Sequence, residues 1–246
     1  MDRLVYVAME GAKEILRAQT ANNHNLANAS TTGFRADLSA FQTRDITGAG
    51  LPSRAYATDS SVGWDGATGE LSATGRDLDV AIKGAGWLAV QAPDGSEAYT
   101  RAGDLRVDPS GVLTTANGNA VLGDSGPVAV PPHASLMIGG DGSISVVPLG
   151  QEAKTISTVG RLKLVNPPSG DMVRGADGLF RLSSGAPASA DASVRLLSGT
   201  LESSNVNIAE TMTNMIELAR NYDLQVKAIH TAEETAATSA KLLQTS

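Results

Sequence analysis

The C-terminal part of the chain carries one long stripe of apolar residues. From Ile208 to Leu243, apolar side chains recur at alternating steps of three and four residues, and only Glu233 interrupts the series. This spacing is typical of a helix that packs along a second helix. Asn207 stands directly before the stripe and Glu210 follows three residues later, which is the pattern of a helix N-cap. We therefore expect a helix from Ile208 to about Leu243. Its contact residues are expected to be Met212, Met215, Ala219, Tyr222, Val226 and Ile229.

A second stripe with the same spacing begins at the N-terminus. It predicts a helix over residues 3 to about 28, and it turns polar at Gln19 and Asn22. Neither stripe is wide enough to form a core alone, so we expect the two helices to pair and to be weakly ordered until further copies cover them. The expected contact residues of this first helix are Val5, Ala8, Ala12, Ile15 and Leu26.

Between the stripes, short apolar runs alternate with turns rich in Gly, Pro and Asp. This pattern predicts a series of antiparallel hairpins. The expected strands are residues 78–82, 87–90, 98–101, 104–107, 111–115, 120–123, 135–139, 143–147, 158–165, 179–182 and 194–201.

The predicted fold class is α+β, with long N- and C-terminal helices pairing as a coiled coil and a mostly antiparallel, β-rich central domain. Residues 1–32 and 206–246 are expected to form a discontinuous helical assembly domain. Residues 33–77 are expected to be an extended connector, and residues 78–205 the β-rich domain.

Composition narrows the functional classes. The 246 residues are 41% hydrophobic, which is enough for a core, but only 4% aromatic, and the net charge is -7. Without a basic run, the chain is not expected to bind nucleic acid. Cysteine is absent, which excludes disulfides and thiolate chemistry. The N-terminal segment contains Asp2, Glu10 and Lys13, so it is predicted to be neither a secretory signal nor a membrane span.

No motif predicts catalysis or a bound cofactor. The run GAGWLA at residues 84–89 fits a dinucleotide fingerprint, but it leads into a strand and not a helix, so we interpret it as a tight turn. The three histidines lie in different segments without metal-ligand spacing, and a G-x-S-x-G elbow is absent. The acid pairs at 77/79 and 233/234 are interpreted as solvated charges. We therefore expect no cofactor, no metal, no small-molecule substrate and no enzymatic activity.

Three stretches resemble the signatures of the flagellar axial proteins, the family of rod and hook subunits. They are NLANASTTGFRAD (residues 25–37), the β segment at 78–115, and SGTLESSNVNIAETMTNMIELARNY (198–222), which occur in the family's order over nearly the whole chain. The opening MDRLVYVAMEGA and the length are most similar to the proximal-rod members. His24 departs from the family's usual Asn, which would make its contact pH-sensitive.

The resemblance implies a structural subunit of the bacterial flagellar basal body, located in the periplasm, that assembles helically and transmits torque for motility. It implies unfolded passage through the flagellar type III export apparatus without a cleaved signal peptide. The implied partners are copies of the chain and other rod subunits, with no membrane insertion.

The residues that match the family's motifs are expected to fix how the helices meet the β domain, with Phe34 as an apolar anchor and Gly33 as a backbone hinge. They are Asn25, Asn28, Thr31, Gly33, Phe34, Leu201, Glu202, Asn205 and Asn207.

Two alternatives stay open from the sequence. One is a distal rod or related axial protein. The other is a periplasmic, carbohydrate-active hydrolase on a β scaffold, which would need a pair of carboxylates that converge in a cleft. We expect no such pair.

Overall fold

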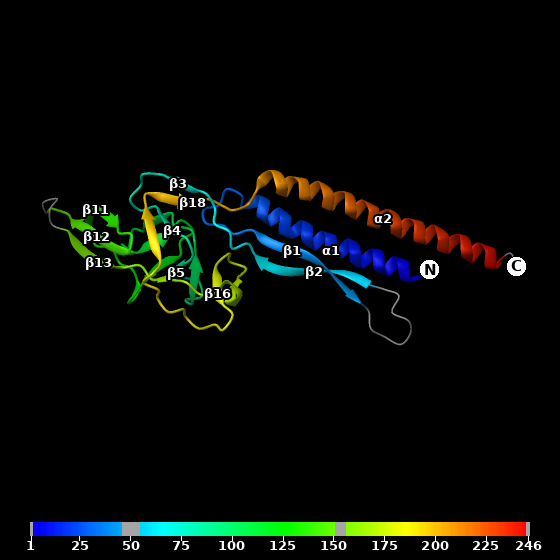
Figure 1. Ribbon diagram of the computed structural model, residues 1–246, viewed down its shortest axis with the longest axis horizontal. Coiled ribbons are helices and arrows are strands. Elements are labelled where there is room, and N and C mark those ends of the chain that lie inside the picture. Colours follow the sequence, from blue (N-terminus) through cyan, green and yellow to red (C-terminus); the bar gives the residue numbers. More distant parts are fainter. Residues whose placement is uncertain (1, 46–54, 151–155, 245–246) are drawn as a thin grey trace. The chain divides into compact units, whose positions relative to one another are not determined.

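The computed structural model describes residues 2–45, 55–150 and 156–244 (Figure 1). The chain divides into two compact units. The helical unit comprises Met1–Ala29, Ala36–Asp65 and Val206–Ser246, and the β unit comprises Ser30–Arg35 and Gly66–Asn205. The chain thus passes from one unit to the other at four points.

Two long helices pair in the helical unit, which confirms the predicted fold class. They are α1 (Asp2–Ala27) and α2 (Ile208–Gln244), and Figure 1 shows them side by side. The Asn22 side chain donates a hydrogen bond to the carbonyl oxygen of Thr211 (2.8 Å), and Gly11 faces the side chain of Gln225. Since later residues of α1 meet earlier residues of α2, the helices run antiparallel.

A β-hairpin covers a further part of α1. Its strands β1 (Asp37–Asp45) and β2 (Ala55–Trp64) pair antiparallel and contact α1. This hairpin lies in the segment that was expected to be an extended connector. Its strands are rich in Ser, Thr and Asp, and the register shifts between Leu38 and Ser39, so the regular apolar alternation of a strand is weak.

The β unit is built from antiparallel strands. The main sheet has the order β15-β16-β6-β5-β9-β8-β7, with β10 on β9 and β14 on β5. A second sheet has the order β11-β12-β13, and the pairs β17-β4 and β18-β3 are formed between strands far apart in the chain. A short 3₁₀ helix at Ser169–Asp171 precedes β15.

The strand bounds are β3 (Leu71–Ala73), β4 (Val80–Lys83), β5 (Trp87–Gln91), β6 (Glu97–Thr100), β7 (Leu105–Val107), β8 (Leu113–Thr115), β9 (Ala120–Gly123), β10 (Gly126–Pro127), β11 (His133–Ile138), β12 (Ser143–Pro148), β13 (Ser157–Arg161), β14 (Leu164–Val165), β15 (Met172–Arg174), β16 (Phe180–Leu182), β17 (Arg195–Ser198) and β18 (Thr200–Glu202).

The core of the β unit comes from inward-facing aliphatic residues of both sheets. Val90 and Val121 from the main sheet and Ile144 and Val146 from β12 belong to one buried cluster. In β12 these buried residues alternate with half-buried Ser143, so one face of the strand is packed. Burial of this aliphatic surface is the main driving force for folding of the unit.

Three details differ from what the sequence predicts. The expected strand 158–165 is divided into β13, which pairs with β12, and β14, which pairs with β5. The expected strand 194–201 is divided at Gly199, whose φ of 67° lets β17 and β18 pair with different strands. Asp79 is buried and not solvated, because its carboxylate accepts hydrogen bonds from the Thr74 hydroxyl (2.6 Å) and the Arg76 guanidinium (2.8 Å).

Candidate functional site

Three segments of the β unit are tied together beside the points where the chain enters and leaves that unit. They are residues 30–35, 66–70 and 202–205, and we call them the clasp. The Ser203 amide donates to the Glu70 carbonyl (2.8 Å), and the Asn205 side chain donates to the Ala67 carbonyl (3.0 Å). The Asn205 amide also donates to the Phe34 carbonyl (3.3 Å). The segments that lead to the helical unit are therefore held at defined positions.

Glu202 is the centre of the clasp. Its backbone carbonyl accepts from the Gly33 amide (2.8 Å), and its Oε1 accepts from the Gly69 amide (3.0 Å). Its carboxylate also pairs with Arg35 (2.6 Å) and Arg101 (2.8 Å). Glu202 and Arg35 are each only 1% exposed. Removing one partner of a buried ion pair leaves an uncompensated charge and typically costs about 3–5 kcal/mol.

Arg101 links the clasp to the turn between β4 and β5. Its guanidinium donates to the carbonyl oxygens of Gly86 (3.0 Å) and Gly84 and lies 5.6 Å from the Trp87 ring centroid. Burial lowers the pKa of Arg101, and the nearby Glu202 carboxylate opposes this shift. Gly84 and Gly86 both have positive φ, so GAGWLA forms the tight turn that its sequence predicts.

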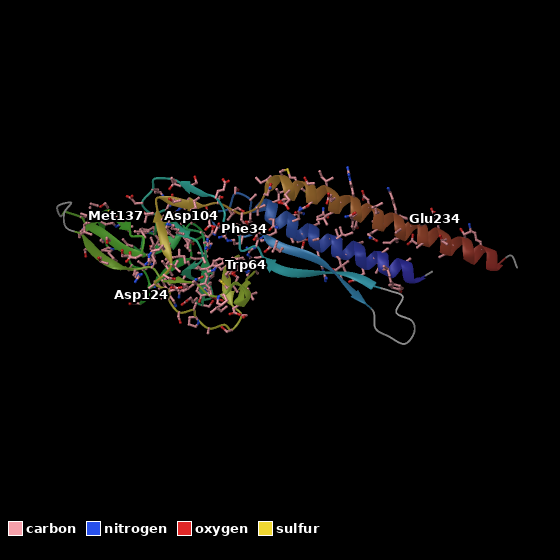
Figure 2. The ribbon with its side chains drawn as sticks, viewed as in Figure 1. Phe34, Trp64, Asp104, Asp124, Met137 and Glu234 are labelled. Atoms are coloured by element: carbon pink, nitrogen blue, oxygen red, sulfur yellow. The ribbon has the colours of Figure 1, made fainter. Side chains whose placement is uncertain are left out.

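Phe34 is anchored by a cation. The Arg174 guanidinium lies 4.7 Å from the Phe34 ring centroid and 4.8 Å from that of Phe180. Arg174 also donates a hydrogen bond to the backbone carbonyl of Arg35. Phe34, which Figure 2 labels, is therefore held by stacking on a guanidinium.

Gly33 can be no other residue without a rearrangement. Its φ is 67°, and a Cβ atom placed on it would lie 2.3 Å from the carbonyl carbon of Arg101. The predicted hinge is thus a point where two backbones approach closely within the β unit.

The remaining N-terminal motif residues organise the end of α1. Asn25 exchanges two hydrogen bonds with the backbone of Asp37 (2.9 and 2.7 Å). The ring of His24 contacts the Asp37 carboxylate (Nδ1 to Oδ2, 2.6 Å), and the Asn28 side chain donates to the His24 carbonyl (2.9 Å). The Thr31 carbonyl accepts from Phe34 (3.3 Å). His24 therefore has a partner within its own chain.

Two C-terminal motif residues, Asn207 and Leu201, support the secondary structure of the chain. The Asn207 side chain accepts from the amides of Ala209 (3.1 Å) and Glu210 (3.3 Å), which confirms the predicted N-cap of α2. Leu201 lies on β18, where it pairs with Ser72.

The predicted contact residues of the helices fall into two groups. On α1, Ala8, Ala12 and Ile15 are buried, and Val5 and Leu26 are half-buried. On α2, Met215, Tyr222, Val226 and Ile229 are half-buried. Among the described side chains of α2, the full set that is not exposed is Thr211, Met215, Leu218, Tyr222, Gln225, Val226, Ala228, Ile229 and Ala232.

Met212 and Ala219 are exposed and do not lie on the face of α2 that pairs with α1. They belong to a row of exposed apolar residues along α2 that we call the outer strip, which consists of Ile208, Met212, Ile216 and Ala219. Ile208 and Met212 are each 49% exposed and Ile216 is 56% exposed. The apolar pattern missed Thr211 and Gln225 because they are polar, yet they occupy the paired face. On α1, Tyr6, Met9 and Leu16 are also exposed.

Comparison with known proteins identifies the family. Residues 197–242 match the model of the flagellar basal body rod FlgEFG protein C-terminal region, and residues 81–146 match that of the flagellar hook protein FlgE/F/G D1 domain. The chain is 44% identical to the flagellar basal-body rod protein FlgF of Escherichia coli and 43% identical to that of Salmonella typhimurium, and both alignments cover all of each chain. The chain belongs to the FlgF family of flagellar basal-body rod proteins.

The comparison also bears on the alternatives. A rod protein FlgG from Buchnera aphidicola is 32% identical over 91% of this chain and 94% of its own length, which is less than the identity to the two FlgF proteins. FlgF-family members are structural rod subunits and not enzymes, so the hydrolase alternative is set aside. The matched C-terminal region of this family contains Glu202, Asn205, Asn207 and the outer strip.

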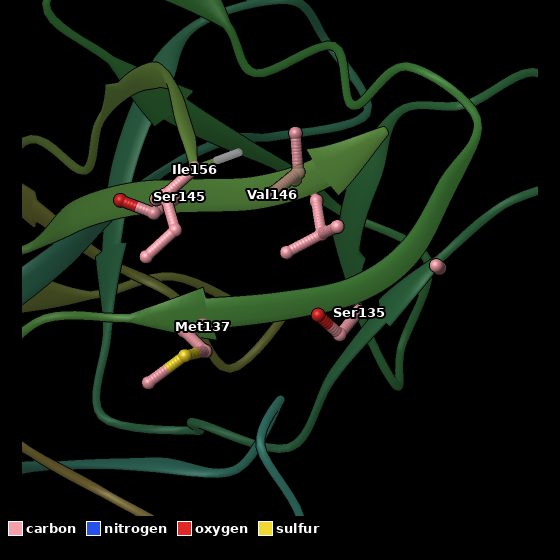
Figure 3. A pocket seen from close by; sticks show the side chains of 7 residues that line it. Ser135, Met137, Ser145, Val146 and Ile156 are labelled. Carbon is pink, nitrogen blue, oxygen red and sulfur yellow. The ribbon is translucent and has the colours of Figure 1, made fainter. Parts of the chain in front are cut away.

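Two surface hollows are formed by described residues of this FlgF-family chain. A hollow of about 260 Å³ on the β11-β12-β13 sheet is lined by uncharged residues that include Ser135, Met137 and Ser145 (Figure 3). An open groove of about 700 Å³ is lined by Asp171 and Asp191 among Pro, Ser and Ala residues. Hydrogen bonds from the hydroxyl and amide of Ser193 lower the pKa of Asp191, which is opposite to the shift of a glycosidase's acid.

The described residues contain no group of three or more His, Asp or Glu side chains that could hold a metal ion. Within the same residues, no helix has the length and apolar character needed to cross a membrane.

Proposed function

We propose that this FlgF-family chain is a subunit of the proximal rod that assembles in the periplasm with copies of itself and with other rod subunits. It reaches the periplasm unfolded, through the flagellar type III export apparatus, without a cleaved signal peptide. Once assembled, it transmits torque for motility.

The outer strip is the observation that carries this proposal. It presents a continuous apolar row on a helix whose other apolar face already packs on α1, within the region that the FlgEFG C-terminal family model matches. Contiguous exposed apolar surface of this kind is typical of a protein-protein interface. Tyr6, Met9 and Leu16 of α1 add a second exposed set on the same pair of helices.

The expected interface residues therefore have two roles in the proposal. Ala8, Ala12, Ile15, Met215 and Tyr222 hold the two helices of one chain together. Met212 and Ala219 contact neighbouring subunits directly, together with Ile208 and Ile216.

The clasp supports a mechanical role. A subunit that transmits torque must resist being pulled open under load. The clasp holds its three segments together with a buried carboxylate, two guanidiniums and backbone hydrogen bonds. A buried network of ion pairs and backbone hydrogen bonds of this kind resists local opening better than exposed loops do.

Mass spectrometry of hook and basal-body complexes purified from the organism that carries this chain tests the proposal. We expect the chain at a stoichiometry comparable to that of other rod subunits, with peptides from the N-terminal segment present. Absence of the chain from complexes that contain the other rod subunits would overturn the proposal. Loss of the N-terminal peptides alone would overturn export without cleavage.

A further inference from the structure

Both units are completed by the last part of the chain. In the helical unit, α1 pairs with α2. In the β unit, β4 pairs with β17 and β3 pairs with β18, across more than a hundred residues of sequence. Leu196 of β17 is also buried in the core. We call residues 195–244 the closing segment. This segment contributes α2 to the helical unit, and β17, β18 and the buried Leu196 side chain to the β unit.

The clasp needs the closing segment because the closing segment supplies the carboxylate that pairs with two buried arginines. Arg35 and Arg101 are both buried, and in the described part of the chain Glu202 is the one carboxylate that forms an ion pair with either of them. Glu202 lies 167 residues after Arg35 and 101 after Arg101. Until Glu202 is in place, folding the clasp would bury two unpaired guanidiniums, which is strongly unfavourable.

Backbone groups of the clasp depend on the same residue. The amide of Gly33 donates to the carbonyl of Glu202, and the amide of Gly69 donates to its carboxylate. By contrast, the β5-β6 hairpin is local, since the Ala92 amide donates to the Ser96 carbonyl (2.9 Å) a few residues away. Local pairs form faster than pairs between distant segments.

We infer that the closing segment is a folding lock, with Glu202 as its positioning residue. The β5-β6 and β8-β9 region can form early, but the clasp and the α1-α2 pair stay open until residues 195–244 are available. A chain that emerges with its N-terminus first therefore stays incompletely folded until almost all of it has emerged. The inference concerns the chain alone and does not depend on its place in the rod.

Ribosome-bound chains test the order directly. The wild-type nascent chain is stalled either at Gln225, which keeps Glu202 inside the ribosomal tunnel, or after a long linker that follows the full chain, which releases the whole closing segment. We expect protease to cut near the clasp in the chain stalled at Gln225 and to leave the clasp intact with the long linker. Equal resistance of the two stalled chains would overturn the inference.

Pulse-labelled hydrogen exchange during refolding of the free, full-length protein tests the same order without the ribosome. The amides of Gly33 and Gly69 should become protected after that of Ala92. Simultaneous protection, or earlier protection of the glycine amides, would contradict a late-closing clasp.

The role of Glu202 has its own test. In Glu202→Gln, native-state exchange at Gly33 and Gly69 should accelerate at least about tenfold while that at Ala92 stays unchanged. Glu70→Gln is the matched control, because the Glu70 side chain is exposed and only its backbone carbonyl bonds in the clasp. If Glu202→Gln behaves like Glu70→Gln, Glu202 is not the positioning residue.

Discussion

Gly33 is a residue at which the backbone of the clasp is tightly constrained, since its φ is positive and a second backbone lies close to it. We expect Gly33→Ala to lower the free energy of unfolding of the β unit by about 2–4 kcal/mol, because the new methyl group would overlap the Arg101 backbone. Denaturant unfolding followed by tryptophan fluorescence measures the change.

Gly95→Ala is the matched control for Gly33→Ala. Gly95 also has positive φ, but a Cβ atom there would meet open space, so the loss should be only about 1 kcal/mol. Equal losses in the two variants would show that the close approach at Gly33 contributes nothing.

Tyr99 links the stability of the β unit to alkaline pH. Burial raises the pKa of its hydroxyl from 10.0 to about 12. The buried phenol donates to Glu97 (2.9 Å) and accepts from the Ala188 amide (2.6 Å). Because the folded-state pKa is raised, this stabilisation is complete below pH 10.0 and is lost as the pH rises towards about 12.

Denaturant unfolding of the wild type and of Tyr99→Phe over this pH range checks the linkage. The free energy of unfolding should fall with pH more steeply in the wild type than in Tyr99→Phe. Parallel pH profiles would mean that Tyr99 ionises equally in the folded and unfolded chains.

Some residues of the clasp could be predicted from the sequence and others could not. Resemblance to the family pointed to Gly33, Phe34, Glu202 and Asn205, and the structure places all of them in the clasp. Arg35, Arg101 and Arg174 were not predicted, because an isolated arginine in a polar stretch carries no periodic signal and its partners lie far away in the chain. Had burial of Glu202 been predicted, it would have indicated a basic partner, because a buried carboxylate is almost always paired.

At the scale of elements, the N-cap of α2 gives a direct test. Replacing Asn207 with Ala removes the acceptor for two amides in the first turn and should destabilise the start of α2 by about 1 kcal/mol. Hydrogen exchange of the amides of Ala209 and Glu210 measures the loss. Asn221→Ala, at an exposed mid-helix position, should cost nothing, because Ala is the better helix former there.

Elements with strong periodicity were predictable, and weakly patterned ones were not. Both helices were expected to within a residue or two of their observed ends, since long stripes and a capping residue mark them. The β1-β2 hairpin gave no such signal, because its strands are polar and its register is interrupted. The break at Gly199 depends on two distant partner strands, and a local pattern does not contain that information.

At the scale of the whole molecule, the outer strip of α2 should decide assembly. We expect Ile216→Asp to abolish motility in cells whose only copy of this protein is the variant, because a charge would be placed on an apolar interface. The isolated variant should keep its helical circular dichroism, since Ile216 is 56% exposed and lies outside the paired face.

Ile216→Leu is the control for that experiment and should preserve motility, because it keeps the apolar surface of the strip. Motile cells with Ile216→Asp would exclude this strip as an assembly interface.

The grouping of segments into units could not be predicted from the sequence. The structure groups residues 30–35 with the β unit and the β1-β2 hairpin with the helices, so the chain crosses between the units four times. These crossings depend on long-range contacts such as those of Arg35 with Glu202, which no local pattern encodes.

Cryo-electron microscopy of basal bodies purified from the organism that carries this chain would show directly whether the outer strip is an assembly surface. We expect the chain to occupy the rod, with Ile208, Met212 and Ile216 packed against neighbouring subunits. Density that places the chain in the rod with this strip facing solvent would contradict the assembly surface, and a rod without the chain would contradict its role as a rod subunit.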